Sequence, residues 1–251
     1  MEIATLQKEL AESQGRREQD MIELATIFNE IQPTPIKVDH RMATKLARLA
    51  GTTALEAMYI LQAIERTKHI PGDWCEYGVA HGRTSALLAE AILDHTSRKL
   101  WLYDSFEGLP APHEKDVLLN DIYGFGSAAA YKGFLAFPEE IVRSEVRNTG
   151  LVDSRVEIKK GWITKEFLRD NSPKQIAFAY LDMDFYQSTY DVLELLTERM
   201  PINGIAVLDD YGFFSEGVKT AFNDVMAKTP YFTIDVPFNS KFAVIARIGK
   251  P

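Results

Sequence analysis

An acidic side chain and two glycines lie close together in the stretch 73–85. Glu76 lies near the end of a short apolar run, and Gly78 and Gly82 follow it before helical spacing begins at Ala86. This order predicts a strand, a glycine turn and a helix. Glycine lets a ligand approach the backbone closely, and the helix N-terminus directs free N–H groups at negative charge. The stretch therefore predicts a small-molecule site.

The spacing of the glycines differs from the dinucleotide-binding fingerprint G-x-G-x-x-G, because Gly78 and Gly82 stand four residues apart. A pyrophosphate cradle is therefore disfavoured. Glu76, at the end of the strand, could hydrogen-bond an amine or hydroxyl of a ligand. An acid two residues before a glycine resembles the first motif of S-adenosylmethionine-dependent methyltransferases.

A second acid ends the next predicted strand. The apolar run 99–103 leads directly into Asp104. Nucleotide-binding α/β folds hold the two hydroxyls of a ribose with an acid at this place. Glu76 and Asp104 together therefore favour a cofactor that carries a ribose.

Three further acids follow two later strands. Asp182 comes after the apolar run 176–181, and Asp209 and Asp210 come after the run 203–208. Ligands of a parallel sheet bind beyond the carboxyl ends of its strands, so we expect these carboxylates to converge there. Crowded carboxylates need a cation or protons to offset their repulsion, and hard oxygen ligands select magnesium, calcium or manganese. The alternative is that the aspartates only cap the helices that follow.

The elements that must position these acids alternate along the chain. Strands are predicted at the run from Asp73 and at 99–104, 155–160, 176–181, 203–208, 232–236 and 242–248, with helices at 139–149 and 188–200. The alternation predicts an α/β fold with a mostly parallel seven-stranded sheet and helices on both faces. The last two strands should form an edge hairpin through Pro237 and Asn239-Ser240.

Ahead of the sheet, apolar spacing predicts helices over residues 1–31 and 41–67, and the polar stretch 13–20 should divide the first of them in two. We expect its apolar stripe to contact another subunit rather than its own domain. The stripe consists of Ile3, Leu6, Leu10, Met21, Leu24, Phe28 and Ile31.

Two regions could serve a substrate. Residues 111–137 are glycine-rich and aperiodic, which is typical of a lid that closes over a pocket, and His113 lies at its start. Trp162 follows the third strand and could stack on an aromatic ligand or fill the end of the core.

Composition excludes several classes of protein. The chain has 251 residues, of which 46% are hydrophobic and 25% charged, so one large domain can form a core. No apolar run approaches the roughly 20 residues of a membrane span, and no signal peptide is recognisable, so we expect a cytoplasmic protein. The net charge of −8 argues against nucleic acid as a partner. The single cysteine, Cys75, is expected to be a buried apolar residue.

Four motifs together resemble the macrocin O-methyltransferase family, magnesium-dependent enzymes that methylate sugar hydroxyls of natural products, including antibiotics. The resemblance covers about residues 70–227, and its motifs are Glu76-Tyr77-Gly78-Val79, Tyr103 to Pro110, Leu181 to Thr189 and Leu208 to Gly212. The chain departs from the pattern at Met183, where glycine is frequent, and at His81, where an aromatic residue is common. Neither change removes a ligand, but both could reshape the pocket.

The resemblance implies a Rossmann-like class I methyltransferase domain over residues 69–251, preceded by a helical extension over 1–68. It implies that S-adenosylmethionine binds at the turns after three strands, on Glu76, Tyr77, Gly78, Asp104, Ser105, Phe106, Gly161 and Trp162. It also implies Mg²⁺, or another hard divalent cation, on Asp182, Asp209 and Asp210, with Asp182 as the catalytic base. Asp184 or a histidine remains an alternative base. The expected partners are a sugar-bearing small molecule and further copies of the chain.

Methyl transfer to a hydroxyl agrees with this set of residues. A hydroxyl is too weak an acid to lose its proton unaided, and a divalent cation beside a carboxylate base removes that obstacle. One alternative is a nucleotide-dependent oxidoreductase, which the missing third glycine and the unexplained aspartates disfavour. The other is a noncatalytic ligand-binding protein.

Overall fold

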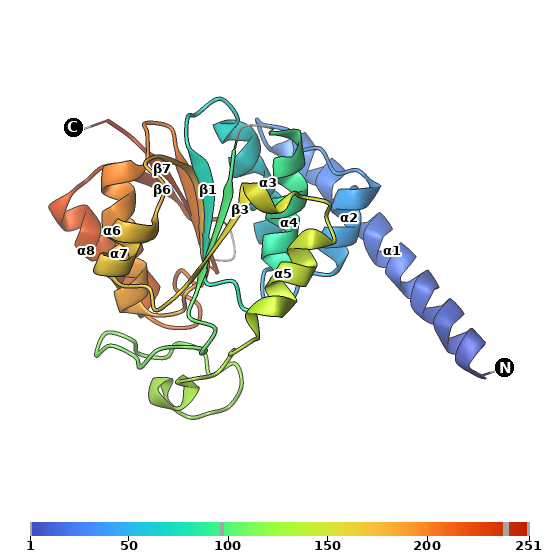
Figure 1. Ribbon diagram of the computed structural model, residues 1–251, viewed down its shortest axis with the longest axis horizontal. Coiled ribbons are helices and arrows are strands. Elements are labelled where there is room, and N and C mark those ends of the chain that lie inside the picture. The colour runs from blue at the N-terminus through green and yellow to red at the C-terminus, as the bar shows by residue number, and fades with distance from the viewer. Residues whose placement is uncertain (1, 96–97, 238–240, 250–251) are drawn as a thin grey trace.

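The computed structural model describes residues 2–95, 98–237 and 241–249, with side chains from residue 8 onward. A seven-stranded sheet lies at its centre, in the order β3-β2-β1-β4-β5-β7-β6 (Figure 1). The strands are β1 (Asp73–Tyr77), β2 (Leu100–Asp104), β3 (Val156–Lys160), β4 (Ile176–Leu181), β5 (Ile205–Leu208), β6 (Phe232–Asp235) and β7 (Ala243–Arg247).

The sheet is parallel from β3 to β5, and β7 runs antiparallel between β5 and the edge strand β6. The expected fold is confirmed, as is the edge hairpin. Asn239 and Ser240, expected in its turn, lie outside the described residues. From β1 the chain passes to β2 on one side, and it returns from β3 to β4 on the other side of β1. This reversal opens a crevice beyond the carboxyl ends of β1 and β4, where open α/β sheets bind ligands.

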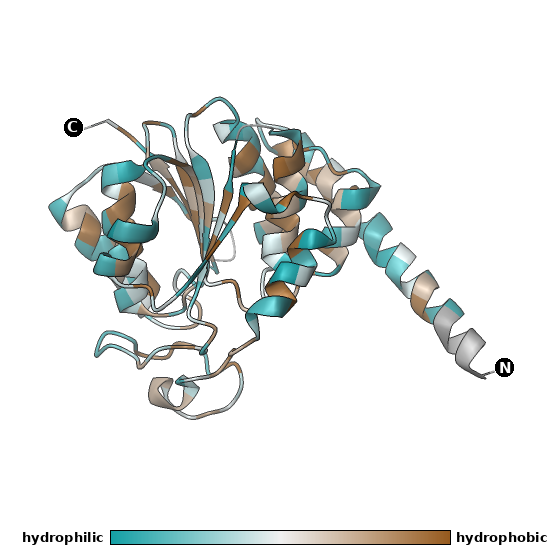
Figure 2. Cartoon of the chain, viewed as in Figure 1, coloured by the Kyte–Doolittle hydropathy of each residue, from teal (hydrophilic) through white to brown (hydrophobic). Residues whose placement is uncertain are grey.

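Helices cover both faces of the sheet (Figure 1). They are α1 (Glu2–Ile31), α2 (His40–Ala47), α3 (Ala54–Thr67), α4 (Arg83–Ala91) and α5 (Glu139–Arg147) on one side, and α6 (Lys165–Asn171), α7 (Tyr186–Arg199) and α8 (Gly217–Lys228) on the other. The six residues of β4 are all buried, and Figure 2 shows the central strands mostly in the colours of apolar residues. A continuous apolar run is what a strand covered on both faces requires. Cys75, in β1, is buried as expected.

Helix α1 corrects one expectation, because it is continuous through residues 13–20. The polar residues of that stretch are mostly good helix formers, and Gly15 costs only about 1 kcal/mol relative to alanine. The end of α1 packs on its own domain, with Ala25 and Phe28 buried. Its beginning projects away from the body (Figure 1), and there the side chain of Leu10 is exposed. Ile3 and Leu6 lie outside the described side chains.

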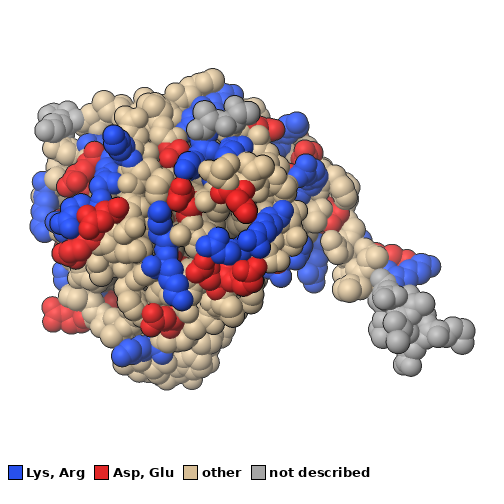
Figure 3. All heavy atoms as spheres, in the orientation of Figure 1, with Lys and Arg blue, Asp and Glu red and all other residues tan. Residues whose placement is uncertain are grey.

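The loop between β2 and α5 contains one short helix, η2 (Ala128–Tyr131), and is otherwise irregular. Further short helices are η1 (Ile92–Asp94) and η3 (Asp153–Arg155). Residues near the start of the loop attach to the segment before α8 through the bridge between Leu118 and Ser215. The loop lies at the lower edge of Figure 1, where the space-filling view shows mostly uncharged atoms (Figure 3). Elsewhere on that face, basic and acidic side chains are intermixed.

Among the described residues, no helix is long and apolar enough to cross a membrane.

Candidate active site

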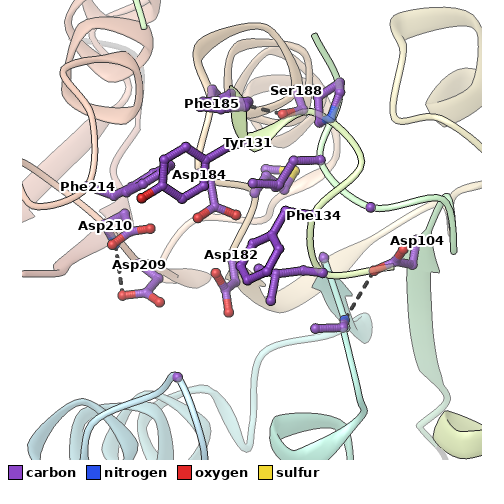
Figure 4. A pocket seen from close by; sticks show the side chains of 18 of the residues that line it. Asp104, Tyr131, Phe134, Asp182, Asp184, Phe185, Ser188, Asp209, Asp210 and Phe214 are labelled. Atoms are coloured by element: carbon purple, nitrogen blue, oxygen red, sulfur yellow. Dashed lines mark hydrogen bonds between the residues drawn. The ribbon is translucent and has the colours of Figure 1, made fainter. Parts of the chain in front are cut away.

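A cavity of about 680 Å³ opens at the carboxyl ends of β1, β2, β4 and β5 (Figure 4). Its floor is formed by the turns that follow these strands, and its outer wall by the loop between β2 and α5. The cavity therefore occupies the crevice that the reversal of strand order creates.

The glycine turn after β1 lies against the end of β4. Gly78 has a φ of +81°, and a Cβ at this residue would lie 1.8 Å from the carbonyl oxygen of Asp182. Such a distance excludes every side chain, because real Cβ atoms essentially never come within 3.0 Å of a neighbouring atom. The turn ends at Gly82, the N-cap of α4, with a φ of +78° and no side-chain cap. Because residue 78 is a glycine, the turn after β1 can lie in direct contact with the end of β4, which carries Asp182.

Asp104 organises the same turn from the end of β2. Its Oδ2 accepts hydrogen bonds from the backbone N–H groups of Val79 (2.8 Å) and Ala80 (3.1 Å). Its Oδ1 accepts one from the N–H of Phe106 (2.7 Å). The carboxylate also lines the cavity. It therefore holds two loops together where a ribose would have to bind.

The residues expected to hold the cofactor divide into two groups. Gly78, Asp104, Ser105 and Trp162 line the cavity. The others are absent from the described lining, and these are Glu76, Tyr77, Phe106 and Gly161.

Glu76 lies beneath the turn rather than facing the cavity. It is fully buried, and its Oε2 has no hydrogen-bond partner among the described residues. Burial, together with the charge of Asp104, raises the pKa of its carboxyl to about 8. Burial thus disfavours the charged form of Glu76.

Four aspartates face the cavity from the ends of β4 and β5. Oxygen atoms of Asp182, Asp184 and Asp210 lie within 4.8 Å of one another (Figure 4). Asp209 lies beside them, and its Oδ1 accepts a hydrogen bond from the N–H of Asp210 (2.8 Å). The expected convergence of Asp182, Asp209 and Asp210 on one cavity is therefore observed, and Asp184 joins them.

The backbone is strained at two of these acids. Asp184 has a φ of +63° and Asp210 a φ of +53°, a region that residues with a Cβ rarely adopt. Strained residues of this kind cluster at functional sites, where the surrounding structure enforces them. The strain turns both carboxylates toward Asp182 (Figure 4).

Burial and mutual repulsion disfavour ionisation of the cluster. Burial raises the pKa of Asp184 and that of Asp209 to about 6 each. Burial and the charge of Asp209 raise the pKa of Asp182 and of Asp210 well above the ordinary range. A divalent cation would remove this conflict, and a set of carboxylate oxygens suits a hard ion such as Mg²⁺. Asp182, Asp184 and Asp210 therefore form the set of described residues that fits a metal, and Asp184 stands in it where Asp209 was expected.

The outer wall of the cavity is aromatic. Tyr131, Phe134, Phe185 and Phe214 pack together and line it, with the rings of Tyr131 and Phe214 4.9 Å apart. Their separation in sequence gave no sign that they would meet. His113 also lines the cavity, and its ring lies 4.8 Å from that of Tyr186. The start of the loop thus reaches the pocket.

A protein-family model and several characterised proteins match the sequence of the chain. The model of the family described as Macrocin-O-methyltransferase (TylF) matches residues 42–236. A tetracenomycin-C 4'-O-methyltransferase of Streptomyces olivaceus, which acts on a dimethoxy-rhamnosyl derivative, is 34% identical over 150 residues, or 57% of this chain and 54% of that protein. Demethyldecarbamoylnovobiocin O-methyltransferase of Streptomyces niveus is 33% identical over 147 residues, with the same two coverages. The chain spans about half the length of these curated relatives.

Solved structures agree with the fold. The O-methyltransferase NovP superposes with a TM-score of 0.69 at 25% identity, over 94% of this chain and 100% of that one. The calicheamicin methyltransferase CalS11 superposes with a TM-score of 0.63 at 20% identity, over 94% and 93% of the two chains. The sheet, its covering helices and the helix that precedes them are thus shared with class I methyltransferases.

Proposed function

The chain belongs to the macrocin O-methyltransferase family, and from this premise we propose that it transfers the methyl group of S-adenosylmethionine to a sugar hydroxyl of a natural product. One observation carries the proposal: the glycine turn after β1 touches the backbone of Asp182, so a cofactor on that turn and an acceptor at the acids would share one cavity. Direct methyl transfer requires this proximity, because the acceptor oxygen must lie in line behind the methyl group.

The residues toward the cofactor have distinct tasks. Gly78 would leave room for S-adenosylmethionine at the turn, Asp104 would accept hydrogen bonds from its ribose hydroxyls, and Ser105 and Trp162 would contact its adenine. Asp104 would therefore bind the ribose, and it also fixes the glycine turn through its hydrogen bonds to the backbone. Glu76, Tyr77, Phe106 and Gly161 are not in the described cavity lining, so we assign them no direct contact with the cofactor.

The aspartates are proposed to bind a divalent cation and to accept the proton of the acceptor hydroxyl. Asp182, Asp209 and Asp210 would hold Mg²⁺ or another hard divalent cation, which when bound makes a nearby hydroxyl more acidic. Asp182 is the proposed base, and its carboxylate oxygen accepts the hydroxyl proton. Asp184 is a second candidate, because its carboxyl lines the same cavity within 4.8 Å of the carboxyls of Asp182 and Asp210.

The charge of the cavity favours a neutral acceptor. Among its described lining residues, six are aspartates and Lys241 is the one lysine or arginine. A sugar nucleotide would bring a diphosphate into this acidic site. Exposed apolar side chains of the lid lie at 117–125, and Ile122 and Tyr123 of this group also line the cavity. We therefore propose a sugar joined to an apolar aglycone.

Transfer of labelled methyl from S-adenosylmethionine tests the proposal. Aryl glycosides should be methylated, and the corresponding sugar nucleotides should be poor acceptors. Asp182→Asn is the sharpest variant, because asparagine keeps an oxygen ligand but cannot take the proton. Turnover should therefore fall further than Mg²⁺ affinity. Full activity in this variant, or in chelator with metal shown to be absent, would refute the metal and base assignments.

Calorimetry separates the alternatives. A methyltransferase should bind S-adenosylmethionine and not NAD, whereas an oxidoreductase should do the reverse. A noncatalytic ligand-binding protein should bind a ligand but turn over none of the acceptors.

A further inference from the structure

A buried glutamate reaches the acidic site from the N-terminal helices. Glu56 lies in the first turn of α3, where Thr53 is the N-cap. The two residues form a capping box: Thr53 Oγ1 accepts from the N–H of Glu56 (3.2 Å), and Glu56 Oε2 accepts from the N–H of Thr53 (3.4 Å). A capping box satisfies helix N–H groups and does not require burial. Yet Glu56 is only 1% exposed.

The second carboxyl oxygen of Glu56 makes a contact that helix capping does not require. Its Oε1 accepts a hydrogen bond from the hydroxyl of Tyr180, on β4 (3.2 Å). The same hydroxyl lies 3.5 Å from Oδ2 of Asp209. The hydroxyl of Tyr180 thus lies within hydrogen-bonding distance of both carboxyls. Tyr180 therefore bridges Glu56 and Oδ2 of Asp209, while Oδ1 of Asp209 accepts a hydrogen bond from the N–H of Asp210.

A chain of hydroxyls extends this network toward the cofactor turn. Thr52 Oγ1 lies 3.3 Å from the hydroxyl of Tyr180 and 2.7 Å from Oγ1 of Thr84. Thr84 is in the first turn of α4, two residues after Gly82. Burying a carboxyl in this way is costly unless its hydrogen bonds are made, and here both oxygens have partners. The network links the strand-end acids to the helix that follows the glycine turn.

We propose that Glu56 is a positioning residue that, with Tyr180, orients the carboxylate of Asp209 toward the cation site. This inference rests on the proposed function, because it takes Asp209 as a ligand of the divalent cation. Groups that hold a metal ligand from behind fix its direction, and their loss typically lowers metal affinity 10- to 100-fold. The N-terminal helices therefore contribute a residue that positions a metal ligand, in addition to covering the sheet.

Calorimetric titration of the metal-free full chain with Mg²⁺ tests the inference, with S-adenosylmethionine titrated separately. Glu56→Ala should weaken Mg²⁺ binding about 10- to 100-fold and leave the affinity for S-adenosylmethionine unchanged. Glu56→Gln should restore most of the Mg²⁺ affinity, because its amide oxygen can still accept the hydrogen bond from Tyr180. Thr53→Ala is the matched control: it removes the cap and should lower the melting temperature by about 2–4 °C, with Mg²⁺ affinity unchanged.

Wild-type Mg²⁺ affinity in a folded Glu56→Ala protein would overturn the inference and leave Glu56 as a helix cap alone. If Glu56→Ala does not fold, Tyr180→Phe decides, because it removes only the hydroxyl. A weaker Mg²⁺ affinity in Tyr180→Phe then supports the inference, and an unchanged one overturns it. Binding of S-adenosylmethionine without any Mg²⁺ binding by the wild-type chain would instead refute the metal assignment, and this inference with it.

Discussion

Replacing Gly78 with alanine tests whether contact between the glycine turn and the end of β4 creates the site. The new Cβ would lie 1.8 Å from the carbonyl oxygen of Asp182, where 3.0 Å is the practical minimum, so the two segments must separate by about 1 Å. Misplacement by about 1 Å can cost 100-fold in rate. The positive φ of +81° adds roughly 1–2 kcal/mol of backbone strain for alanine.

Gly150→Ala is a control for the strain alone. Gly150 has a φ of +85°, and a Cβ there would meet nothing within 4 Å. Both variants should lose roughly 1–2 kcal/mol of unfolding free energy through strain, and Gly78→Ala should lose more through the collision. Only Gly78→Ala should lose affinity for S-adenosylmethionine and about 100-fold in turnover. Chemical denaturation, calorimetry and labelled methyl transfer measure these quantities. Equal stability and activity in the two variants would refute the reasoning.

Three further outcomes are expected. Asp104→Ala should weaken S-adenosylmethionine binding by about one to two decades in calorimetry, because hydrogen bonds to a charged group contribute roughly 1.5–3 kcal/mol; wild-type affinity would refute the ribose assignment. In the metal-free chain, Asp184 and Asp209 have folded pKa values of about 6 against an ordinary 3.8, so the folded state binds more protons and the melting temperature should fall as pH rises from about 4 to 6. Saturating Mg²⁺ should then raise the melting temperature strongly at pH 7.5 and little at pH 5, and an equal rise at both would argue against carboxylate ligation. Removing residues 1–13, which include the exposed Leu10 but spare the buried Phe28, should convert oligomers to monomers in light scattering if the projecting half of α1 contacts another subunit; an unchanged mass would exclude this contact.

Periodicity was sufficient to predict the sheet. The run 176–181 coincides with β4, and the other predicted strands overlap the observed ones to within two residues at each end. Apolar runs identify buried strands reliably because a strand covered on both faces can tolerate few polar side chains. The expected break in α1 was wrong because polarity by itself does not end a helix, and residues 13–20 contain no proline.

The sequence by itself determined which strand ends carry acids. Because ligands of a parallel sheet bind beyond the carboxyl ends of its strands, it also predicted that Asp182, Asp209 and Asp210 lie at one edge. Only the tertiary structure decided which oxygens face one another. Asp184 joins the cluster through a positive φ that no sequence pattern predicts, and Glu56 is linked to Asp209 through Tyr180 from a helix more than a hundred residues earlier in the chain. It also decided that Glu76 lies beneath the turn and outside the cavity lining. The physical reason is that backbone hydrogen bonding between strands fixes where the strands end, and the pattern of apolar residues in the sequence identifies those strands. Side-chain directions depend instead on local dihedral angles and on packing between segments that are distant in sequence.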